Sequence, residues 1–159
     1  MSPELKLYYI AEAHFIRAFC YFDLAKTFGK APLIEHAQQL DEDLLVYPTN
    51  FDGLINFIVN ECDLFSNNLE IPFTNEMKGH ATKGAFLALK SRALLYWASP
   101  LNNPNNDISR WEKAATAAYD VIKLNIYHLY KNGETPYYSL ILSLIHISEP
   151  HETRHDLVC

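Results

Sequence analysis

The segment between Leu5 and Phe28, which holds no glycine or proline, constrains the fold of this chain more than any other feature. It contains YYIAEAHFIRAFCYFDLAKTF, in which mostly apolar residues follow helical spacing along two lines. The lines are Ala11, Phe15, Ala18, Phe22, Ala25 and Ile10, Arg17, Tyr21, Leu24, Phe28. A helix that is apolar on two sides must be sandwiched between neighbours. Gly29, followed by Pro32, predicts its end.

Two further segments predict helices with different apolar patterns. A start signal at Thr49–Asp52 precedes a single apolar stripe that extends toward Ile71-Pro72. The stripe consists of Leu54, Ile58, Cys62, Phe65 and Leu69. The next predicted helix opens near Thr82, is apolar on nearly all sides, and ends at Pro100.

A fourth helix is predicted from the sequence Ser109-Arg110-Trp111-Glu112. In this pattern the Ser109 hydroxyl can accept from the N3 amide while Glu112 reaches back to the cap amide. Its expected apolar stripe is Trp111, Ala114, Ala115, Ala118, Val121 and Ile122. The predicted fold class is therefore all-α, built from two pairs of helices.

The two pairs are related in sequence. The run from Arg17 to Phe22, RAFCYF, recurs from Arg92 to Trp97 as RALLYW. A small alanine lets the next helix approach closely while the aromatics interlock, which is typical of tetratricopeptide-like helical hairpins. The two copies lie about 75 residues apart, which is longer than two tetratricopeptide units of 34 residues, so extended loops are expected.

Composition excludes several classes of function. A formal charge of −6, with 13 Lys+Arg against 19 Asp+Glu, provides no basic surface for nucleic acid. The three cysteines are far apart and indicate neither a disulfide framework nor a zinc ribbon. There is no apolar run of membrane-spanning length, and the first residues lack the pattern of a signal peptide. As written, the sequence alone predicts a chain that stays in the cytoplasm.

One motif is typical of an enzyme. His151-Glu152-Thr153-Arg154-His155 matches the H-E-x-x-H pattern, in which two histidines bind zinc and the glutamate activates water. A catalytic zinc site needs a third ligand and a supporting helix, yet only four residues follow and Pro150 precedes. We therefore predict no catalytic, cofactor-binding or metal-binding residues.

Other candidate groups have a structural alternative beside a functional one. The loop Ser99–Asp107 holds four asparagines next to Trp97, which could bind sugar hydroxyls, whereas asparagine and proline also favour plain turns. The turn interpretation is preferred. Arg17 and Arg92 are expected to anchor packing through buried hydrogen bonds or ion pairs. The isolated histidines His14, His36, His80 and His128 are expected to be structural.

The sequences of the predicted helices resemble those of the SusD/RagB family. The first block of resemblance runs from Ala11 to Ala18 and continues through Tyr21–Leu24, Phe28-Gly29 and Pro32–Ile34. The second block runs from Ala81 to Tyr96. The third comprises Trp111, Ala114-Ala115, Asp120–Ile122 and Tyr127–Leu129. Cys20 and Ser91 depart from the family's usual residues.

The resemblance implies a surface-exposed outer-membrane lipoprotein of Bacteroidetes-type bacteria. Such a protein captures glycans or other nutrients over a partner TonB-dependent transporter of the SusC type, and it is not an enzyme. The helices would form the scaffold, whereas the ligand-stacking aromatics would come largely from segments on either side. The lipidated cysteine that would anchor the protein to the membrane is absent here, as are the signal peptide and the C-terminal half. The chain is therefore expected to be an internal fragment whose ligand-binding residues are unknown.

The end of the chain resembles a translated sequencing adapter. Residues 142–150, LSLIHISEP, match the translation of a transposase-type sequencing adapter, and a one-base slip continues the match into His151-Glu152-Thr153. We therefore predict a family-like helical region at 1–141 and an adapter-derived tail at 142–159. The main functional alternative, on the helix pattern alone, is a generic tetratricopeptide-type protein-interaction module, and a zinc hydrolase is the third.

Overall fold

The computed structural model describes residues 2–39, 41, 44–69 and 79–127. Its helices are α1 Pro3–Phe28, α2 Phe51–Phe65, the short 3-10 helix η1 Ser66–Leu69, α3 Lys83–Ala98 and α4 Ile108–Lys123. Two strands, β1 (Ala31–Pro32) and β2 (Pro48–Thr49), pair antiparallel. All these elements lie in one compact unit, Met1–Leu124.

The ends of α1 are set by local hydrogen bonding. Ser2 caps its start by accepting from the Leu5 amide at 3.2 Å, and Pro3 occupies the first turn, where no amide donor is needed. At the other end Gly29 adopts a left-handed conformation, with φ of 71°, and its amide donates to the Ala25 carbonyl at 2.9 Å. The predicted helix end at Gly29 is therefore confirmed.

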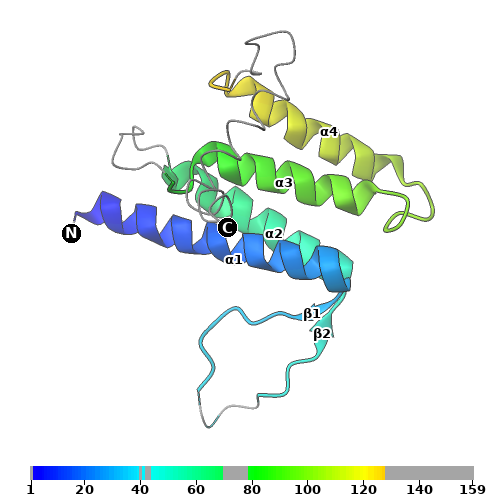
Figure 1. Cartoon of the computed structure of the whole chain (residues 1–159), viewed down its shortest axis with the longest axis horizontal. Helices are drawn as coiled ribbons and strands as arrows, with labels where there is room; N and C mark the ends of the chain where they lie inside the picture. Colours follow the sequence, from blue (N-terminus) through cyan, green and yellow to red (C-terminus); the bar gives the residue numbers. More distant parts are fainter. Residues whose placement is uncertain (1, 40, 42–43, 70–78, 128–159) are drawn as a thin grey trace, which may run out of the picture. The chain divides into compact units, whose positions relative to one another are not determined.

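The helices alternate in direction, and α3 lies between α2 and α4 (Figure 1). The helix α1 packs mainly on α2, which packs on α3, which in turn packs on α4. Each consecutive pair forms an antiparallel hairpin, as in tetratricopeptide-type repeats. The prediction of an all-α fold of helical hairpins is thus confirmed for the described residues, with the β1–β2 pair as a small addition.

Small residues and interlocking aromatics form the core, as the repeated sequence predicted. Ala18 and Ala93, the equivalent alanines of the two repeats, are both completely buried. Phe22 meets Tyr96 edge-on, with ring centroids 5.3 Å apart, and Phe15 meets Phe86 in the same way at 5.2 Å. Alanine lets the backbones approach, so that rings on neighbouring helices can reach one another.

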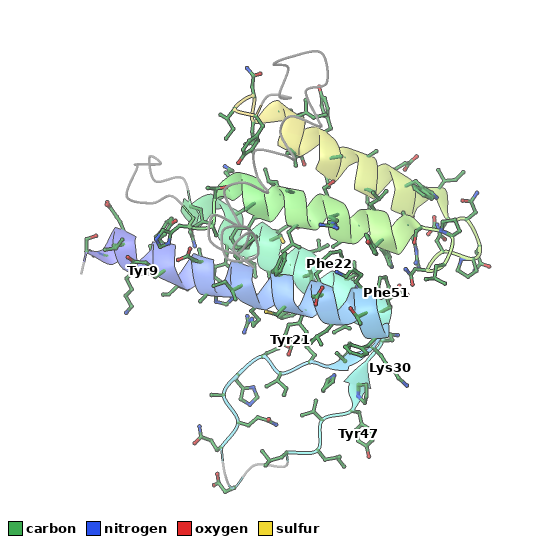
Figure 2. The ribbon with its side chains drawn as sticks, in the orientation of Figure 1. Tyr9, Tyr21, Phe22, Lys30, Tyr47 and Phe51 are labelled. Carbon is green, nitrogen blue, oxygen red and sulfur yellow. The ribbon has the colours of Figure 1, made fainter. Side chains whose placement is uncertain are left out.

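The connection between α1 and α2 is held to α1 by one tyrosine. The Tyr21 hydroxyl donates to the Ile34 carbonyl at 3.2 Å and accepts from the Ile34 amide at 2.8 Å. Figure 2 shows Tyr21 on the side of α1 that faces this connection and Phe22 on the opposite side. Adjacent aromatics of one repeat therefore serve two different contacts.

The second helix covers the whole predicted stripe, since α2 ends at Phe65 and η1 continues to Leu69, while Ile71-Pro72 lie outside the described residues. The predicted start of the fourth helix is wrong. The fourth helix is capped by Asp107 rather than Ser109, because the Asp107 carboxylate accepts from the Ser109 amide at 2.9 Å.

The predicted apolar stripe of α4 is also largely wrong. Ala114 and Ala117 are the residues buried on this helix. Trp111 is 37% exposed and Ile122 is 69% exposed, because α3 covers only one side of α4 in the described unit. The apolar pattern therefore extends beyond the face that is buried here.

The outward face of α1 is similarly uncovered. Tyr9, Ile16 and Phe19 are 45%, 56% and 52% exposed. The expected sandwich of α1 is thus realised on one side in the described residues, where α2 and α3 lie. Among the described helices, none combines the length and apolar character that a bilayer span requires.

Candidate ligand-binding groove

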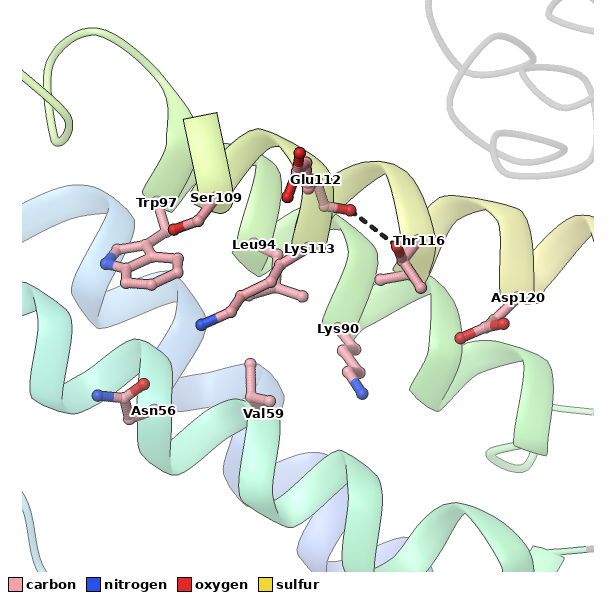
Figure 3. Close-up of a pocket in the computed structure, with 11 residues that line it drawn as sticks. Asn56, Val59, Lys90, Leu94, Trp97, Ser109, Glu112, Lys113, Thr116 and Asp120 are labelled. Carbon is pink, nitrogen blue, oxygen red and sulfur yellow. Dashed lines mark hydrogen bonds between the residues drawn. The ribbon is translucent and has the colours of Figure 1, made fainter. Parts of the chain in front are cut away.

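A groove of about 500 Å³ opens between α2 and α4, with α3 as its floor (Figure 3). The floor is formed by Lys90, Leu94 and Trp97, which lie on one face of α3 because they are spaced four and three residues apart. One wall comes from Asn56 and Val59 of α2. The volume falls within the range of small-molecule sites, roughly 300–1,000 Å³.

The wall from α4 carries most of the polar groups. It consists of Ser109, Glu112, Lys113, Thr116, Ala117 and Asp120. Figure 3 shows the Lys113 side chain extended across the groove from α4 toward α2. The Thr116 hydroxyl donates to the Glu112 carbonyl at 2.8 Å, so that its lone pairs remain available as acceptors.

The charges that line the groove are balanced. Lys90 pairs with Asp63 and Asp120 pairs with Lys123 at 3.4 Å, so two of the charged side chains already have partners. The remaining two, Glu112 and Lys113, are sequence neighbours of opposite sign, and Lys113 Nζ lies 5.4 Å from the Trp97 ring centroid. The groove therefore presents donors and acceptors without an excess of either charge.

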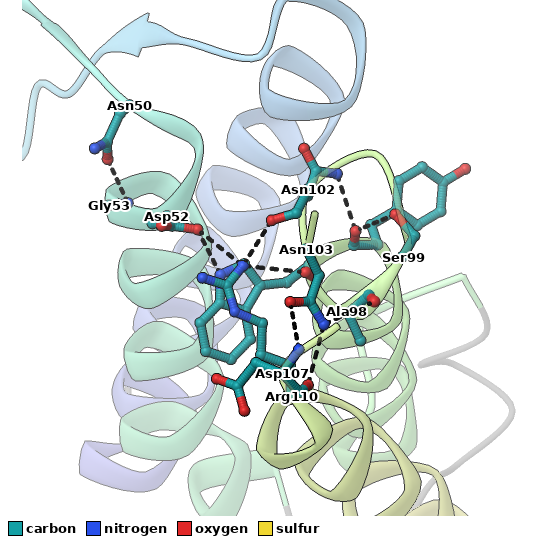
Figure 4. A network of polar contacts seen from close by, with 11 residues as sticks. Asn50, Asp52, Gly53, Ala98, Ser99, Asn102, Asn103, Asp107 and Arg110 are labelled. Carbon is teal, nitrogen blue, oxygen red and sulfur yellow. Dashed lines mark hydrogen bonds and ion pairs between the residues drawn. The ribbon is translucent and has the colours of Figure 1, made fainter. Parts of the chain in front are cut away.

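Trp97 is fixed at one end of the groove by two other helices. Its indole nitrogen donates to the Asp52 carboxylate of α2 at 2.6 Å, and the Arg110 guanidinium of α4 lies 4.2 Å from its ring centroid. Arg110 also contacts Asp52 at 3.5 Å (Figure 4). These contacts hold the indole in one orientation.

Asparagine side chains of the loop Ser99–Asp107 form hydrogen bonds with backbone groups, which confirms the turn interpretation. The amide of Asn102 donates to the Tyr96 carbonyl at 3.0 Å. Asn103 is 4% exposed, and its side chain both donates to the Asp107 carbonyl at 3.0 Å and accepts from the Asp107 amide at 2.8 Å (Figure 4). These two amides are therefore engaged in shaping the turn that starts α4.

A cluster of polar side chains joins α1 to α2. The Glu61 carboxylate, 8% exposed, accepts from Arg17 Nη2 at 2.8 Å and lies 2.7 Å from His14 Nδ1. Arg17 also donates to the Glu35 carbonyl at 2.9 Å, and the His14 ring stacks on Phe65. The predicted anchoring role of Arg17 is confirmed.

Arg92, which occupies the position of Arg17 in the second sequence repeat, makes different contacts. Arg92 is exposed, and its guanidinium lies 6.0 Å from the Phe22 ring centroid; no carboxylate partner is found for it in the described part of the chain. The expectation of a buried bond or ion pair at Arg92 is wrong, since its helix position faces outward whereas the position of Arg17 faces α2.

Glu12 links α1 to the segment that precedes α3. Its carboxylate lies 2.9 Å from His80 Nδ1 and accepts from the Ala81 amide at 3.0 Å. The structural role expected for His14 and His80 is therefore confirmed. Their acidic partners lie 47 and 68 residues away in sequence, so spacing could not have identified them.

No metal centre is found among the described residues, since no group of three or more His, Cys, Asp or Glu is gathered there. The H-E-x-x-H residues 151–155 and His128 lie outside the described ranges. Burial raises the pKa of the Cys62 thiol to about 12, so this buried cysteine is a poor nucleophile. The side chain of Ser109 holds the pKa of Asp107 below its usual value.

No protein-family model matches the chain. In sequence it is 26% identical over 113 residues to SusD-like protein P25 of Formosa agariphila, covering 69% of this chain and 21% of the relative. In structure it is similar to a SusD-like protein from Bacteroides fragilis, with a TM-score of 0.73, 25% identity, and coverage of 88% of this chain and 25% of that one. The chain resembles SusD-like proteins in both sequence and fold.

A second SusD-like structure from Bacteroides fragilis is described as a carbohydrate-binding protein. It is 28% identical, has a TM-score of 0.65, and covers 78% of this chain and 22% of its own length. The chain thus spans about a fifth to a quarter of the length of these SusD-like proteins. The resemblance recognised in the helix sequences is confirmed.

Proposed function

We propose that this chain supplies the tetratricopeptide-like scaffold of a glycan- or nutrient-binding component in a SusC/SusD-type outer-membrane uptake system. The observation that carries the proposal is the joint likeness, in sequence and fold, to a SusD-like carbohydrate-binding protein. The partner would be a TonB-dependent transporter of the SusC type. The site of action would be the cell surface, through a lipid anchor.

The interior of the described unit supports a scaffold that binds without catalysis. Glu61, Glu12, His14 and His80, which could otherwise act as acids or bases, are occupied in contacts between helices and connections. Catalytic acids and bases need access to a substrate, whereas these groups hold elements in place.

Glycan binding is tested by isothermal titration calorimetry of the protein expressed from the intact locus, of which this chain would be the scaffold part, against a panel of oligosaccharides. The panel contains maltohexaose, laminarihexaose and cellohexaose, with oligogalacturonate as an acidic probe. Saturable binding of at least one member is the expected result. A protein that is folded by circular dichroism and binds none of them would contradict the glycan-binding role.

The partnership is tested in the source organism with an affinity tag on the intact locus. We expect a TonB-dependent transporter to co-purify, and its gene to lie directly upstream. Absence of both would count against the uptake role and leave the generic tetratricopeptide-type interaction module, which the helical hairpins alone equally support.

We also propose the division of the chain into 1–141 and 142–159, a tail that lies entirely outside the described residues. Its support is the nine-residue match of 142–150 to a translated adapter. Codons that do not spell the adapter over residues 142–153 would refute it.

A further inference from the structure

We propose that the outward face of α4 binds the same face of a second copy of this chain, so that two α4 helices pack antiparallel in a symmetric dimer. The inference does not depend on glycan binding. It rests on three properties of that face, namely its exposed apolar stripe, the symmetry of the stripe and the charges beside it.

An apolar stripe follows the side of α4 that α3 leaves uncovered (Figure 1). It consists of Ile108, Trp111, Ala115, Ala118 and Ile122, all of them exposed. Their spacing alternates between three and four residues, which places them within an arc of about 80° and is the spacing of a helix–helix seam. Ile108 and Ile122 are 67% and 69% exposed. A contiguous apolar face of this kind marks a contact with another protein surface.

Trp111 can contribute its ring to such a contact without leaving a polar group unpaired. Its indole nitrogen donates to the side-chain oxygen of Asn106 at 3.3 Å, within the same chain. The exposed part of the ring therefore requires only an apolar surface opposite it.

The stripe is nearly symmetric along the helix. Trp111 and Ile122 are large and lie toward the two ends, whereas Ala115 and Ala118 are small and lie between them. The outer pair and the inner pair have the same midpoint along the helix. A two-fold axis through this point places Trp111 opposite the partner's Ile122, and Ala115 opposite the partner's Ala118. The small residues allow the two backbones to approach and the large ones close the ends, which gives the self-complementary surface that a symmetric dimer requires.

The charges beside the stripe are complementary in the antiparallel arrangement. Glu112 directly follows Trp111 near the start of α4, and Lys123 directly follows Ile122 at its end, so both lie on the same flank of the stripe. The two-fold rotation keeps that flank on one side, and it brings Glu112 level with the partner's Lys123 to within about 3 Å along the helix axis. Glu112 has no ion-pair partner in the described part of the chain, and Lys123 has one exposed contact, to Asp120 at 3.4 Å. A parallel pair would place like charges together, so charge favours the antiparallel pair.

Charge reversal tests this geometry. Glu112→Lys places two lysines at each end of the homodimer, and Lys123→Glu places two glutamates there. Each variant alone should therefore dimerise with a Kd about five- to thirtyfold higher than that of the unreversed chain. An equimolar mixture of the two variants pairs opposite charges at both ends, and its Kd should return to within about threefold of the unreversed value.

A second variant tests the centre of the stripe, and a matched control lies on the other side of α4. Ala118→Gln keeps a good helix former but separates the two backbones, so the Kd should rise about tenfold or more. Lys113→Glu makes the same change of charge as Lys123→Glu, at a position where Nζ lies 5.4 Å from the Trp97 ring centroid. The Kd of this control should stay within about twofold of the unreversed value.

Sedimentation equilibrium of the full chain at about 5–500 μM measures each Kd. Every protein carries Ile16→Lys, so that association through the exposed side of α1 does not contribute, and a reductant is present because Cys20 is exposed. Circular dichroism confirms that each variant is folded.

A folded chain that stays monomeric over this range would overturn the proposal. Dimers that neither charge reversal weakens, or that the mixture of the two variants does not restore, would show that the copies meet through another surface. Equal weakening by Lys113→Glu and Lys123→Glu would assign the effect to net charge and refute the antiparallel contact. None of these results bears on the glycan-binding role, which is measured separately.

Discussion

The buried carboxylate of Glu61 offers a sharp test of what holds α1 against α2. Replacing it with leucine removes the carboxylate that Arg17 and His14 share and leaves the guanidinium with neutral partners, the Glu35 carbonyl and His14 Nδ1 at 2.9 Å. Breaking a fully buried ion pair in this way costs about 3–5 kcal/mol. Arg17 is 28% and His14 is 25% exposed, so both can be partly hydrated, and we expect a loss of about 2–3 kcal/mol.

A double-mutant cycle separates the pair from its surroundings. Arg17→Met keeps most of the side-chain stem but leaves the Glu61 carboxylate buried with only His14, so it should also cost about 2–3 kcal/mol. The double variant leaves neither charge unpaired and should cost little more than either single change. The expected coupling energy is therefore about 2 kcal/mol.

Urea unfolding followed by far-UV circular dichroism measures the four free energies of unfolding. The exposed pair of Lys26 and Asp23, studied by the same kind of cycle, is the control and should show coupling of about 0–0.5 kcal/mol. Additive effects of Glu61→Leu and Arg17→Met, with coupling no larger than in the control, would refute the argument that burial makes this pair interdependent.

Four other predictions concern single residues. In the folded chain the Cys62 thiol should resist iodoacetamide where exposed Cys20 reacts, and peptide mapping that finds both equally labelled would contradict this. Because burial raises the folded-state pKa of Cys62 to about 12 from an ordinary 9.0, stability should be unaffected by this group below 9.0 and decline as pH rises above it, by roughly 1.4 kcal/mol per pH unit. Because the folded-state pKa of Asp107 is lowered, the stabilising effect of this carboxylate is present above its ordinary pKa of 3.8 and is lost as pH falls through the lower folded-state value. Ser109→Ala should move the midpoint of the Asp107 carboxyl titration, followed by NMR, back toward 3.8. An unmoved midpoint would show that Ser109 is not the cause. Ile16→Lys, on the uncovered face of α1, should reduce concentration-dependent self-association in sedimentation, and the same association in both proteins would exclude that face.

The helices were predictable because their determinants are local. Gly29 and Thr82 mark helix boundaries through backbone geometry and capping, and each acts on residues within a few positions. The fourth helix shows the limit of this reasoning. Asp107 and Ser109 are both good caps in sequence, and the choice depends on Asn103 bracing the Asp107 amide, which only the folded loop reveals.

The groove was not predictable from sequence. Its lining residues are scattered over three helices, and Lys113 and Asn56 carry no motif that distinguishes them from ordinary surface residues. Trp97 was singled out for its neighbouring asparagines, yet its partners are Asp52 and Arg110 on other helices. Helical spacing indicates which residues share a face, but not which face of another helix will lie opposite.

The two hairpin connections differ in length, and this difference has a kinetic consequence. The connection from α1 to α2 comprises residues 29–50, which is 22 residues, whereas that from α3 to α4 comprises residues 99–107, which is nine. Closing the longer loop costs about 0.8 kcal/mol more chain entropy by the logarithmic dependence on length. The α3–α4 hairpin should therefore form earlier during folding, with the α1–α2 hairpin docking onto it afterwards. In φ-value measurements, Ala117→Gly in α4 would then give a higher value than Ile58→Val in α2, and the reverse order would show that the larger core contacts of α2 outweigh loop closure.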